Sequence, residues 1–310
     1  MSKKVLVAGS AGFIGSHLVD KLLSLDMDVT GIDNLITGRR NNFEHLSGNN
    51  KFKFVEHDIV EIIPEIGNFD IIINMACPAS PVDYQNIPLE TLWVSAMGTK
   101  NLLELARKNK ALFLHASTSE VYGDPLVHPQ KEDYWGNVNP NGPRSCYDEG
   151  KRFAESLIIN YQKVHGVNAR IFRIFNTYGP RMRVNDGRVI PNFVSQAISG
   201  EEITIYGDGE QTRSFCYIDD LVEGILSVMN AEKFSGPVNL GNPKETSILE
   251  LAELIIDLTD SKSVIVNKAL PQDDPKIRQP DISKARSELG FEPKVDLESG
   301  LKKTIEYFKS

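Results

Sequence analysis

A short apolar run followed at once by three evenly spaced glycines limits the fold of this chain more than any other feature. Residues 5–8 read VLVA, typical of a buried parallel strand, and Gly9, Gly12 and Gly15 then give the pattern G-x-x-G-x-x-G. Residues 16–24 place leucines at helical spacing. Such glycines let the backbone approach a pyrophosphate, and the following helix offers free N–H groups. The pattern predicts a dinucleotide loop, with a plain strand-to-helix turn as the alternative.

Strands and helices alternate through the first 180 residues. Beyond the first unit, strands are predicted at residues 28–32, 52–56, 71–75, 112–116 and 169–174, and helices at 88–109 and 147–166. This alternation predicts an α/β fold, a Rossmann-type doubly wound parallel sheet with helices on both faces.

The sequence pattern changes after Pro180: the candidate strands become short, and the turns are rich in proline, glycine and charged residues. Helices are predicted there at residues 190–199, 217–229, 247–259 and 283–289. We therefore predict two domains: residues 1–178, with the dinucleotide loop and the catalytic residues, and residues 179–310, a smaller C-terminal α/β domain for the substrate. The boundary is soft, and elements of the two domains can interleave.

Composition narrows the class of function. The chain has 310 residues, 41% of them hydrophobic and 25% charged, with a formal net charge of −8. This is ordinary globular composition, and no basic stripe stands out, so a nucleic-acid or anionic-membrane surface is not expected. No apolar run approaches the ~20 residues that a membrane span needs.

Cysteine and histidine usage argues against disulfides and metals. The three cysteines, Cys77, Cys146 and Cys216, form no close pair, and the six histidines show no metal-ligand spacing. We expect the cysteines to be small core residues and no metal to bind. A strand follows MSKK directly, without a signal peptide, so a cytoplasmic location is expected.

Asp33 is the residue that indicates which dinucleotide, NAD or NADP, the loop would bind. It ends the second predicted strand, where a carboxylate accepts hydrogen bonds from the adenosine ribose and repels a 2′-phosphate, so NAD is favoured over NADP. Arg39 and Arg40 follow closely and could counter that repulsion, although we interpret them as a solvated loop. Asp58, after the third strand, could meet the adenine amino group or cap a helix.

Tyr147 and Lys151 predict the reacting centre. They lie four residues apart in SCYDEGKRFAE, so they share one face of a helix. A neighbouring cation favours the phenolate, which makes Tyr147 a candidate general base for a sugar hydroxyl. Thr118 and Ser119 follow a parallel strand, at the edge where ligands bind, and can hydrogen-bond that hydroxyl. A surface helix pair is the alternative for Tyr147 and Lys151 alone.

With these features in place, the chain resembles the extended short-chain dehydrogenase/reductase family and, within it, the UDP-glucuronate decarboxylases. The resemblance spans nearly the whole chain. Its longest segments are STSEVYGDPLVHPQKEDYWGNVNP (117–140), GPRSCYDEGKRFAE (142–155), RIFNTYGPRMRVNDGRV (173–189), YGDGEQTRSFCYIDDLVEG (206–224) and DDPKIRQPDISKA (273–285).

The resemblance implies decarboxylation of UDP-glucuronate to UDP-xylose with tightly bound NAD. C4 of the glucuronic acid is oxidised, and the resulting β-keto acid loses CO₂. The 4-keto intermediate is then reduced again by the bound NADH, so the enzyme is formally a lyase. A nucleotide-sugar 4-epimerase with the same Tyr147–Lys151 pair is the nearest rival, and a catalytically silent NAD-binding regulator is the rival from another class.

The family pattern also implies site residues. The implied catalytic residues are Tyr147, Lys151, Thr118, Ser119, Glu120 and Arg213. The implied NAD-binding residues are Gly9, Gly12, Phe13, Ile14, Gly15, Asp33, Asn34, Thr37, Gly38, Asp58, Ile59, Tyr147 and Lys151. The implied substrate-binding residues are Asn176, Val189, Tyr206, Arg213 and Arg278.

Two of these roles stay open. Related sugar dehydratases carry an aspartate before the glutamate, where this chain has Ser119. The smaller serine leaves space next to Glu120 for the carboxylate of the sugar. Glu120 could instead cap a helix, and Arg213 could touch only the pyrophosphate. The family also implies a homodimer, in which helices near 93–107 and 147–164 pair between subunits. The leucines of these helices suit packing on their own sheet equally well.

Overall fold

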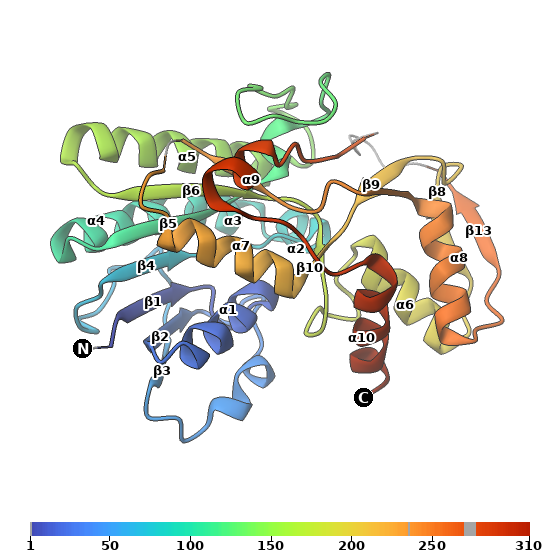
Figure 1. The fold of residues 1–310 in the computed structure, drawn as a ribbon, viewed down its shortest axis with the longest axis horizontal. Coiled ribbons are helices and arrows are strands. Elements are labelled where there is room, and N and C mark those ends of the chain that lie inside the picture. The colour runs from blue at the N-terminus through green and yellow to red at the C-terminus, as the bar shows by residue number, and fades with distance from the viewer. Residues whose placement is uncertain (1, 235, 270–276) are drawn as a thin grey trace.

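Seven parallel strands form the central sheet of the computed structural model, which describes residues 2–234, 236–269 and 277–310 (Figure 1). Their order is β11-β6-β5-β4-β1-β2-β3. The strands are β1 (Lys4–Ala8), β2 (Asp28–Asp33), β3 (Phe52–Glu56), β4 (Ile71–Asn74), β5 (Leu112–Thr118), β6 (Ala169–Ile174) and β11 (Val238–Leu240). The predicted doubly wound α/β class is confirmed.

Both faces of the sheet are buried because its strands are apolar on both sides. In β1, Val5 and Val7 join one hydrophobic cluster, with α1 (Phe13–Ser24) and α7 (Ile218–Asn230). Leu6 and Ala8 join the other, with α4 (Thr99–Asn109) and α5 (Ser145–His165). Alternate side chains of a strand face opposite ways, so each face receives its own helical layer (Figure 1).

The helix predicted at 88–109 is divided into segments. After α2 (Pro81–Asn86), α3 (Pro88–Trp93) passes through a π-helical turn, η3 (Val94–Gly98), into α4. Leu102, Leu103 and Ile158 are fully buried against the sheet, as expected of simple packing. Another set of apolar side chains on α3, η3 and α5 is exposed instead: Leu89, Trp93, Met97 and Phe153.

The C-terminal part contains α6 (Val189–Ser199), α8 (Ile248–Thr259), α9 (Ser283–Leu289) and α10 (Leu297–Lys309). Its short strands pair as β8 (Ile203–Tyr206) with β13 (Ile265–Lys268), β9 (Thr212–Ser214) with β12 (Glu245–Ser247), and β10 (Cys216–Tyr217) with β7 (Thr177–Tyr178). The 3₁₀ turns are η1 (Arg40–Asn42), η2 (Glu44–Leu46) and η4 (Ser119–Tyr122). The sequence did not predict α2 or these short strands, which are too brief to show a period. It also did not predict α10, although that helix has 13 residues and buries Leu301 and Ile305 on one side.

The two parts of the chain share structure. β11 and α7 both come from the later part, yet β11 pairs with β6 and α7 covers the sheet. The hydrophobic cluster under α1 and α7 continues without interruption into α6 and α8. The chain after residue 178 therefore completes the first sheet as well as building the other side of the cavity.

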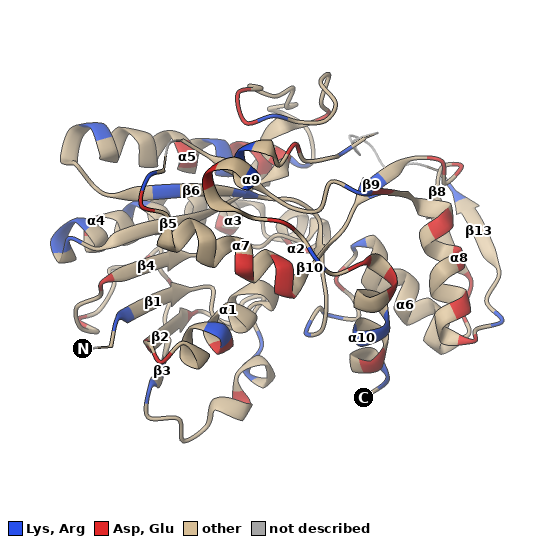
Figure 2. Ribbon diagram, viewed as in Figure 1, with Lys and Arg blue, Asp and Glu red and all other residues tan. Residues whose placement is uncertain are grey.

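Charged side chains of both signs are mixed along the elements (Figure 2). Lys and Arg are seen on α4, α5 and β6, and Asp and Glu on α5, α7 and α8. Among the described residues, no helix is long and apolar enough to cross a membrane.

Candidate active site

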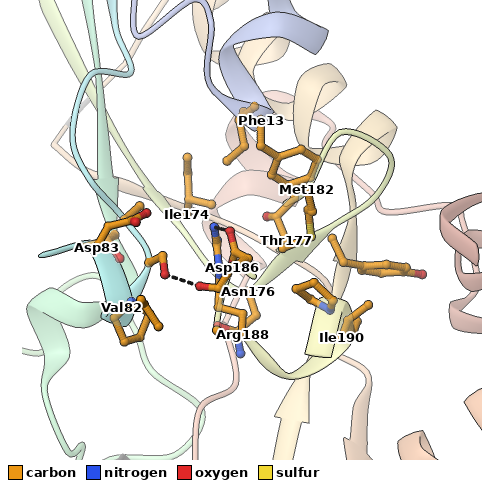
Figure 3. A pocket seen from close by; sticks show the side chains of 18 of the residues that line it. Phe13, Val82, Asp83, Ile174, Asn176, Thr177, Met182, Asp186, Arg188 and Ile190 are labelled. Atoms are coloured by element: carbon orange, nitrogen blue, oxygen red, sulfur yellow. Dashed lines mark hydrogen bonds and ion pairs between the residues drawn. The ribbon is translucent and has the colours of Figure 1, made fainter. Parts of the chain in front are cut away.

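A cavity of about 610 Å³ lies between the carboxyl ends of the strands and the C-terminal elements. In Figure 3, Asp186 and Arg188 lie between Val82 and Asp83 on one side and Ile190 on the other, with Phe13 above them. Sixteen of the residues predicted from the sequence line it: Gly9, Gly12, Phe13, Ile14, Gly15, Thr37, Thr118, Ser119, Glu120, Tyr147, Lys151, Asn176, Val189, Tyr206, Arg213 and Arg278. One cavity thus brings together the predicted cofactor, catalytic and substrate residues.

The glycine loop has the shape of a pyrophosphate cradle. Gly9 has φ +79°, and a Cβ at Gly15 would lie 2.0 Å from the carbonyl oxygen of Gly9. A Cβ at Gly12, which lines the cavity, would have one neighbour within 4 Å, the Gly9 oxygen at 3.3 Å. Gly12 is also the N-cap of α1, with no capping side chain and no acidic residue in the first turn. Free N–H groups and the helix dipole therefore face the cavity, which fits a dinucleotide.

Asp33 lies just behind this loop and holds it. Its Oδ2 accepts from the N–H of Ala11 at 2.9 Å, and its Oδ1 accepts from the N–H of Leu35 at 2.8 Å. Burial raises the pKa of Asp33, and these two hydrogen bonds oppose the rise. A Cβ at Gly38 would lie 2.8 Å from Oδ1, so glycine there leaves room beside the carboxylate. Each oxygen keeps a lone pair for a ribose hydroxyl.

The neighbouring predictions on the cofactor side have mixed outcomes. Asn34 donates to Asp58 at 3.0 Å, and Asp58 also accepts from the N–H of Val60 at 2.9 Å, so Asp58 closes a local turn. Ile59 is a core residue and does not line the cavity. Arg40 pairs with Glu56, as a solvated loop would predict.

Arg39 differs from Arg40, because it lines the cavity. Its guanidinium donates to the carbonyl oxygen of Arg181 at 3.0 Å, and its backbone N–H donates to the carbonyl oxygen of Ala11 at 3.0 Å. A cation thus stands near the loop that Asp33 holds.

Tyr147 is buried at the start of α5, where its ring stacks on Tyr84 with centroids 5.1 Å apart and planes 5° apart. Its hydroxyl hydrogen-bonds the side chain of Thr118, which ends β5. The sequence predicted a lowered pKa, but the structure contradicts that direction. Burial raises the pKa of Tyr147, the nearby Cys77 adds to the rise, and the bond to Thr118 only partly offsets it.

Lys151 lies one turn further along α5, on the same face as Tyr147. Its ammonium donates to the carbonyl oxygen of Ala116 at 2.8 Å and lies 5.9 Å from the centroid of the Tyr147 ring. The expected pair thus exists geometrically. The hydrogen bond to β5 fixes the ammonium near the strand end, and its charge does not overcome the desolvation of the phenol.

Glu120 forms ion pairs with two arginines, one at each carboxylate oxygen. Arg144 donates to its Oε2 at 2.7 Å, and Arg278 pairs with its Oε1. Burial alone would raise the pKa of Glu120, but Arg278 and then Arg144 outweigh it and hold the pKa at about 2. The carboxylate is therefore ionised at neutral pH, and it does not cap a helix.

The second cation beside Glu120 is thus Arg278, for which the sequence predicted contact with the nucleotide. Arg144, just before α5, is the other cation. Arg213 lines the cavity from β9, with its guanidinium donating to the carbonyl oxygen of Thr212 at 2.9 Å, and its backbone bridges to that of Arg278. The signal for Arg278 could not come from local spacing, because 158 residues separate it from Glu120.

A buried ion pair anchors α5 to the sheet. Arg173 on β6 donates to both oxygens of Glu155 on α5, at 2.9 and 2.7 Å, and also to the hydroxyl of Tyr122 at 2.8 Å. Ser117, next to Thr118, donates to Glu155 at 2.5 Å. Glu155 lies four residues after Lys151, so the pair fixes the catalytic face of the helix against the strand end.

No cluster of three or more potential metal-ligating side chains occurs within residues 2–234, 236–269 and 277–310. A buried phenol, a lysine and an arginine-held carboxylate around one cavity are the parts of a sugar-oxidising site.

Comparison with known proteins agrees with this geometry. The family model described as GDP-mannose 4,6 dehydratase matches residues 6–304. UDP-glucuronic acid decarboxylase 1 of Danio rerio is 54% identical over 306 residues, covering 99% of this chain and 72% of that protein. UDP-glucuronic acid decarboxylase 1 of Arabidopsis thaliana is 53% identical over 307 residues, covering 99% of this chain and 70% of that protein.

Solved structures show the same fold at lower identity. UDP-glucuronic acid 4-epimerase from Bacillus cereus, in complex with UDP-glucuronic acid and NAD, superimposes with a TM-score of 0.89, 31% identity and 99% coverage of both chains. UDP-glucose 4-epimerase from Thermotoga maritima gives a TM-score of 0.91 at 30% identity, covering 99% of this chain and 98% of that one. Because about half of all residues match decarboxylases over 99% of its length, the chain belongs to the UDP-glucuronic acid decarboxylase family, within the extended short-chain dehydrogenase/reductases.

Proposed function

We propose that this protein is a carboxy-lyase that converts UDP-glucuronate into UDP-xylose and CO₂ with NAD. The observation that carries the proposal is the identity of 49–54% to eight proteins named UDP-glucuronic acid decarboxylase, each matched over 99% of this chain. The cofactor rests on the glycine cradle with Asp33, and on related structures solved with NAD.

The residues that line the cavity have separate roles, and Asp33, which does not line it, acts from behind the glycine loop. The glycine loop would hold the pyrophosphate of NAD, Asp33 its adenosine ribose and Lys151 its nicotinamide ribose. When bound there, NAD would supply the hydride acceptor for C4 of the sugar and the donor that returns the hydride at the end of the cycle. Tyr147 takes the proton of the C4 hydroxyl, and Thr118 fixes the direction of the phenol. Asn176, Val189, Tyr206 and Arg213 bind the UDP part, where an arginine fork suits a diphosphate.

Loss of CO₂ follows from the sugar chemistry. Oxidation at C4 places a ketone β to the C6 carboxylate, so the C5–C6 bond can break with its electron pair passing into an enolate. A proton at C5 then restores the ketone. Glu120, Arg144 and Arg278 form the charged wall of the site. Together they hold a net positive charge against an anionic sugar and its enolate.

The hydride cycle predicts that NAD is needed only in catalytic amount. With NAD at one hundredth of the UDP-glucuronate concentration, we expect near-complete conversion to UDP-xylose and one CO₂ per sugar. The measurement combines a CO₂ trap with NMR of the sugar product. NADH accumulating in step with CO₂ would contradict the closed cycle and indicate release of the 4-keto pentose. Formation of the C4 epimer without CO₂ would establish the 4-epimerase activity instead.

Asp33→Asn is expected to weaken NAD binding and to narrow the preference for NAD over NADP, each by about tenfold or more. The substitution removes a charged acceptor for the ribose, worth ~1.5–3 kcal/mol, and the repulsion of a 2′-phosphate next to Arg39. Calorimetric titration with both dinucleotides gives the two affinities. Asp28→Asn, at the opposite end of β2, serves as the control. If Asp33→Asn bound NAD and NADP with the same affinities as wild type, Asp33 would only support the glycine loop and would not contact the dinucleotide.

Two further properties belong to the proposal. The exposed Leu89, Trp93, Met97 and Phe153 lie on α3, η3 and α5, and they support a homodimer that pairs these helices between subunits. All three cysteines are free, which supports a reducing, cytoplasmic location. The division at residue 178 into a dinucleotide part and a substrate part is retained as part of the same proposal.

A further inference from the structure

Gln130 connects two loops that meet beside the cavity. It lies in the segment between η4 and α5, and its side chain is fully buried. Its backbone forms a bridge to the segment at Pro280: the N–H of Gln130 donates to the carbonyl oxygen of Gln279 at 2.9 Å, and its own carbonyl accepts from the N–H of Asp281 at 2.9 Å. A third donor, the amide of Asn239, reaches the same carbonyl at 3.0 Å.

The side chain of Gln130 adds a second connection at the same place. Its Oε1 accepts from the N–H of Gln279 at 2.8 Å, and its Nε2 donates to the carbonyl oxygen of Val127 at 2.8 Å. Both the N–H and the carbonyl oxygen of Gln279 are therefore bound by one residue. A polar group that is buried so completely costs stability unless its bonds are made, so loss of the amide would leave the N–H of Gln279 without its acceptor. The backbone bond to the Gln279 carbonyl and the bond from the Gln279 side chain to the carbonyl oxygen of Pro243, at 2.8 Å, would remain, so the peptide would be held on one side only.

Residue 279 matters because its neighbour is Arg278. The Arg278 side chain is 5% exposed, and its guanidinium pairs with Glu120 and donates to the carbonyl oxygen of Gly123 at 3.0 Å. A long arginine loses much rotamer freedom on burial. Because the N–H and the carbonyl oxygen of Gln279 are both bound, the backbone of the adjacent Arg278 is confined as well. The Arg278 guanidinium then reaches Glu120 in a single orientation.

We propose that Gln130 is a positioning residue: by fixing the backbone of Gln279, it keeps Arg278 on Glu120 during the reaction. The inference rests on the proposed function, since Glu120 and Arg278 are taken there as the charged wall that faces the sugar. Gln130 touches neither the cavity nor the reacting atoms. It acts through Arg278 alone.

The charge balance around Glu120 gives this role a measurable signature. The groups that influence Glu120 are Arg278 from the C-terminal segment, Arg144 before α5, Asp148 and Tyr147 on α5, and Tyr84 on α2. Removing Arg278 from its oxygen leaves burial opposed by Arg144 alone. The pKa of the Glu120 carboxyl then rises, and activity that needs the carboxylate declines at a higher pH than in wild type.

A double-mutant cycle in the full-length enzyme tests the proposal, with Gln130→Met, Arg278→Met and the double variant assayed for CO₂ release from UDP-glucuronate. In the wild-type background, Gln130→Met should lower kcat about tenfold or more and shift the acidic limb of its pH profile upward. In the Arg278→Met background the same substitution should change kcat by less than about twofold, because the residue through which it acts is gone. Equal effects in both backgrounds would overturn the proposal.

The controls separate this result from unfolding and from failure of the proposed function. Gln162→Met removes a similar hydrogen bond, from Nε2 to the carbonyl oxygen of Ala169 at 2.8 Å, and should leave kcat and its pH profile unchanged. Wild-type enzyme that releases no CO₂ would contradict the proposed function itself. If Gln130→Met does not fold, Gln130→Glu replaces it. Its protonated form keeps both bonds, so kcat should approach the wild-type value at low pH and fall as the carboxyl ionises, whereas a profile parallel to wild type would refute the role.

Discussion

Replacing Tyr147 by phenylalanine is expected to lower kcat by ~10²–10⁴-fold, because the substitution removes a positioned general base. The ring would keep its stacking on Tyr84, so the cavity should keep its shape and its affinity for UDP. Steady-state kinetics and calorimetric titration with UDP measure the two quantities separately. Residual kcat above a tenth of the wild-type value, a loss below ~1.4 kcal/mol, would show that another group takes the proton.

Tyr84→Phe is the matched control for this result. Within the described residues the Tyr84 hydroxyl has no hydrogen-bond partner, and the ring lies parallel to that of Tyr147. Removing this hydroxyl changes the same aromatic pair without touching the bond to Thr118. We expect a loss of kcat well below that of Tyr147→Phe.

The pH dependence of kcat should identify the same group. Burial raises the pKa of Tyr147, so the neutral phenol is favoured and the phenolate that accepts a proton becomes more abundant as pH increases. Wild-type kcat should therefore rise with pH on the acidic side of its optimum. In Tyr147→Phe the residual activity should lack this rise and keep only the fall at lower pH that protonation of Glu120 causes.

The second large effect is expected on stability, from Arg173→Met. This substitution leaves the largely buried Glu155 carboxylate with Ser117 as its only side-chain donor among the described residues. Breaking a buried ion pair in this way costs ~3–5 kcal/mol of unfolding free energy. Urea unfolding followed by circular dichroism gives the change. The matched control is Arg286→Met, since Arg286 makes a similar two-pronged pair with Glu292, at 2.5 and 2.8 Å, on an exposed surface.

Surface ion pairs contribute at most ~1 kcal/mol, so Arg286→Met should be nearly neutral. A second variant, Arg173→Met with Glu155→Leu, removes both charges and should recover much of the lost stability. If Arg173→Met and Arg286→Met lowered the unfolding free energy equally, the buried pair would not be what anchors α5.

Local patterns were sufficient to predict the parts of the site that are made by neighbours in sequence. The strand at residues 5–8, the glycines after it and the Tyr147–Lys151 spacing each depend on contacts within a few residues, and each occurs where predicted. The short strands β8, β9, β12 and β13 escaped prediction because each gains its hydrogen bonds from a distant partner rather than from an apolar period of its own.

Local sequence patterns could not predict the ion pairs of the site or the direction of the pKa shift of Tyr147. Arg144 and Arg278 reach Glu120 across 24 and 158 residues of sequence. The direction of the Tyr147 pKa was wrong for a related reason. The desolvation that dominates it comes from packing by Tyr84, Cys77 and the cavity wall, whereas the sequence shows only the cation four residues away.

The way β11 closes the sheet limits how such a chain can acquire new specificity. β11 pairs with β6, and the β6 residue Arg170 donates to carbonyl oxygens at the end of α7, at 2.5 and 3.1 Å. A genetic crossover near residue 178 would therefore exchange the nucleotide-sugar wall together with one strand and one helix of the dinucleotide fold. Exchange of the whole later part breaks the pairing of β11 with β6, whereas point changes in the loops that line the cavity leave that pairing intact.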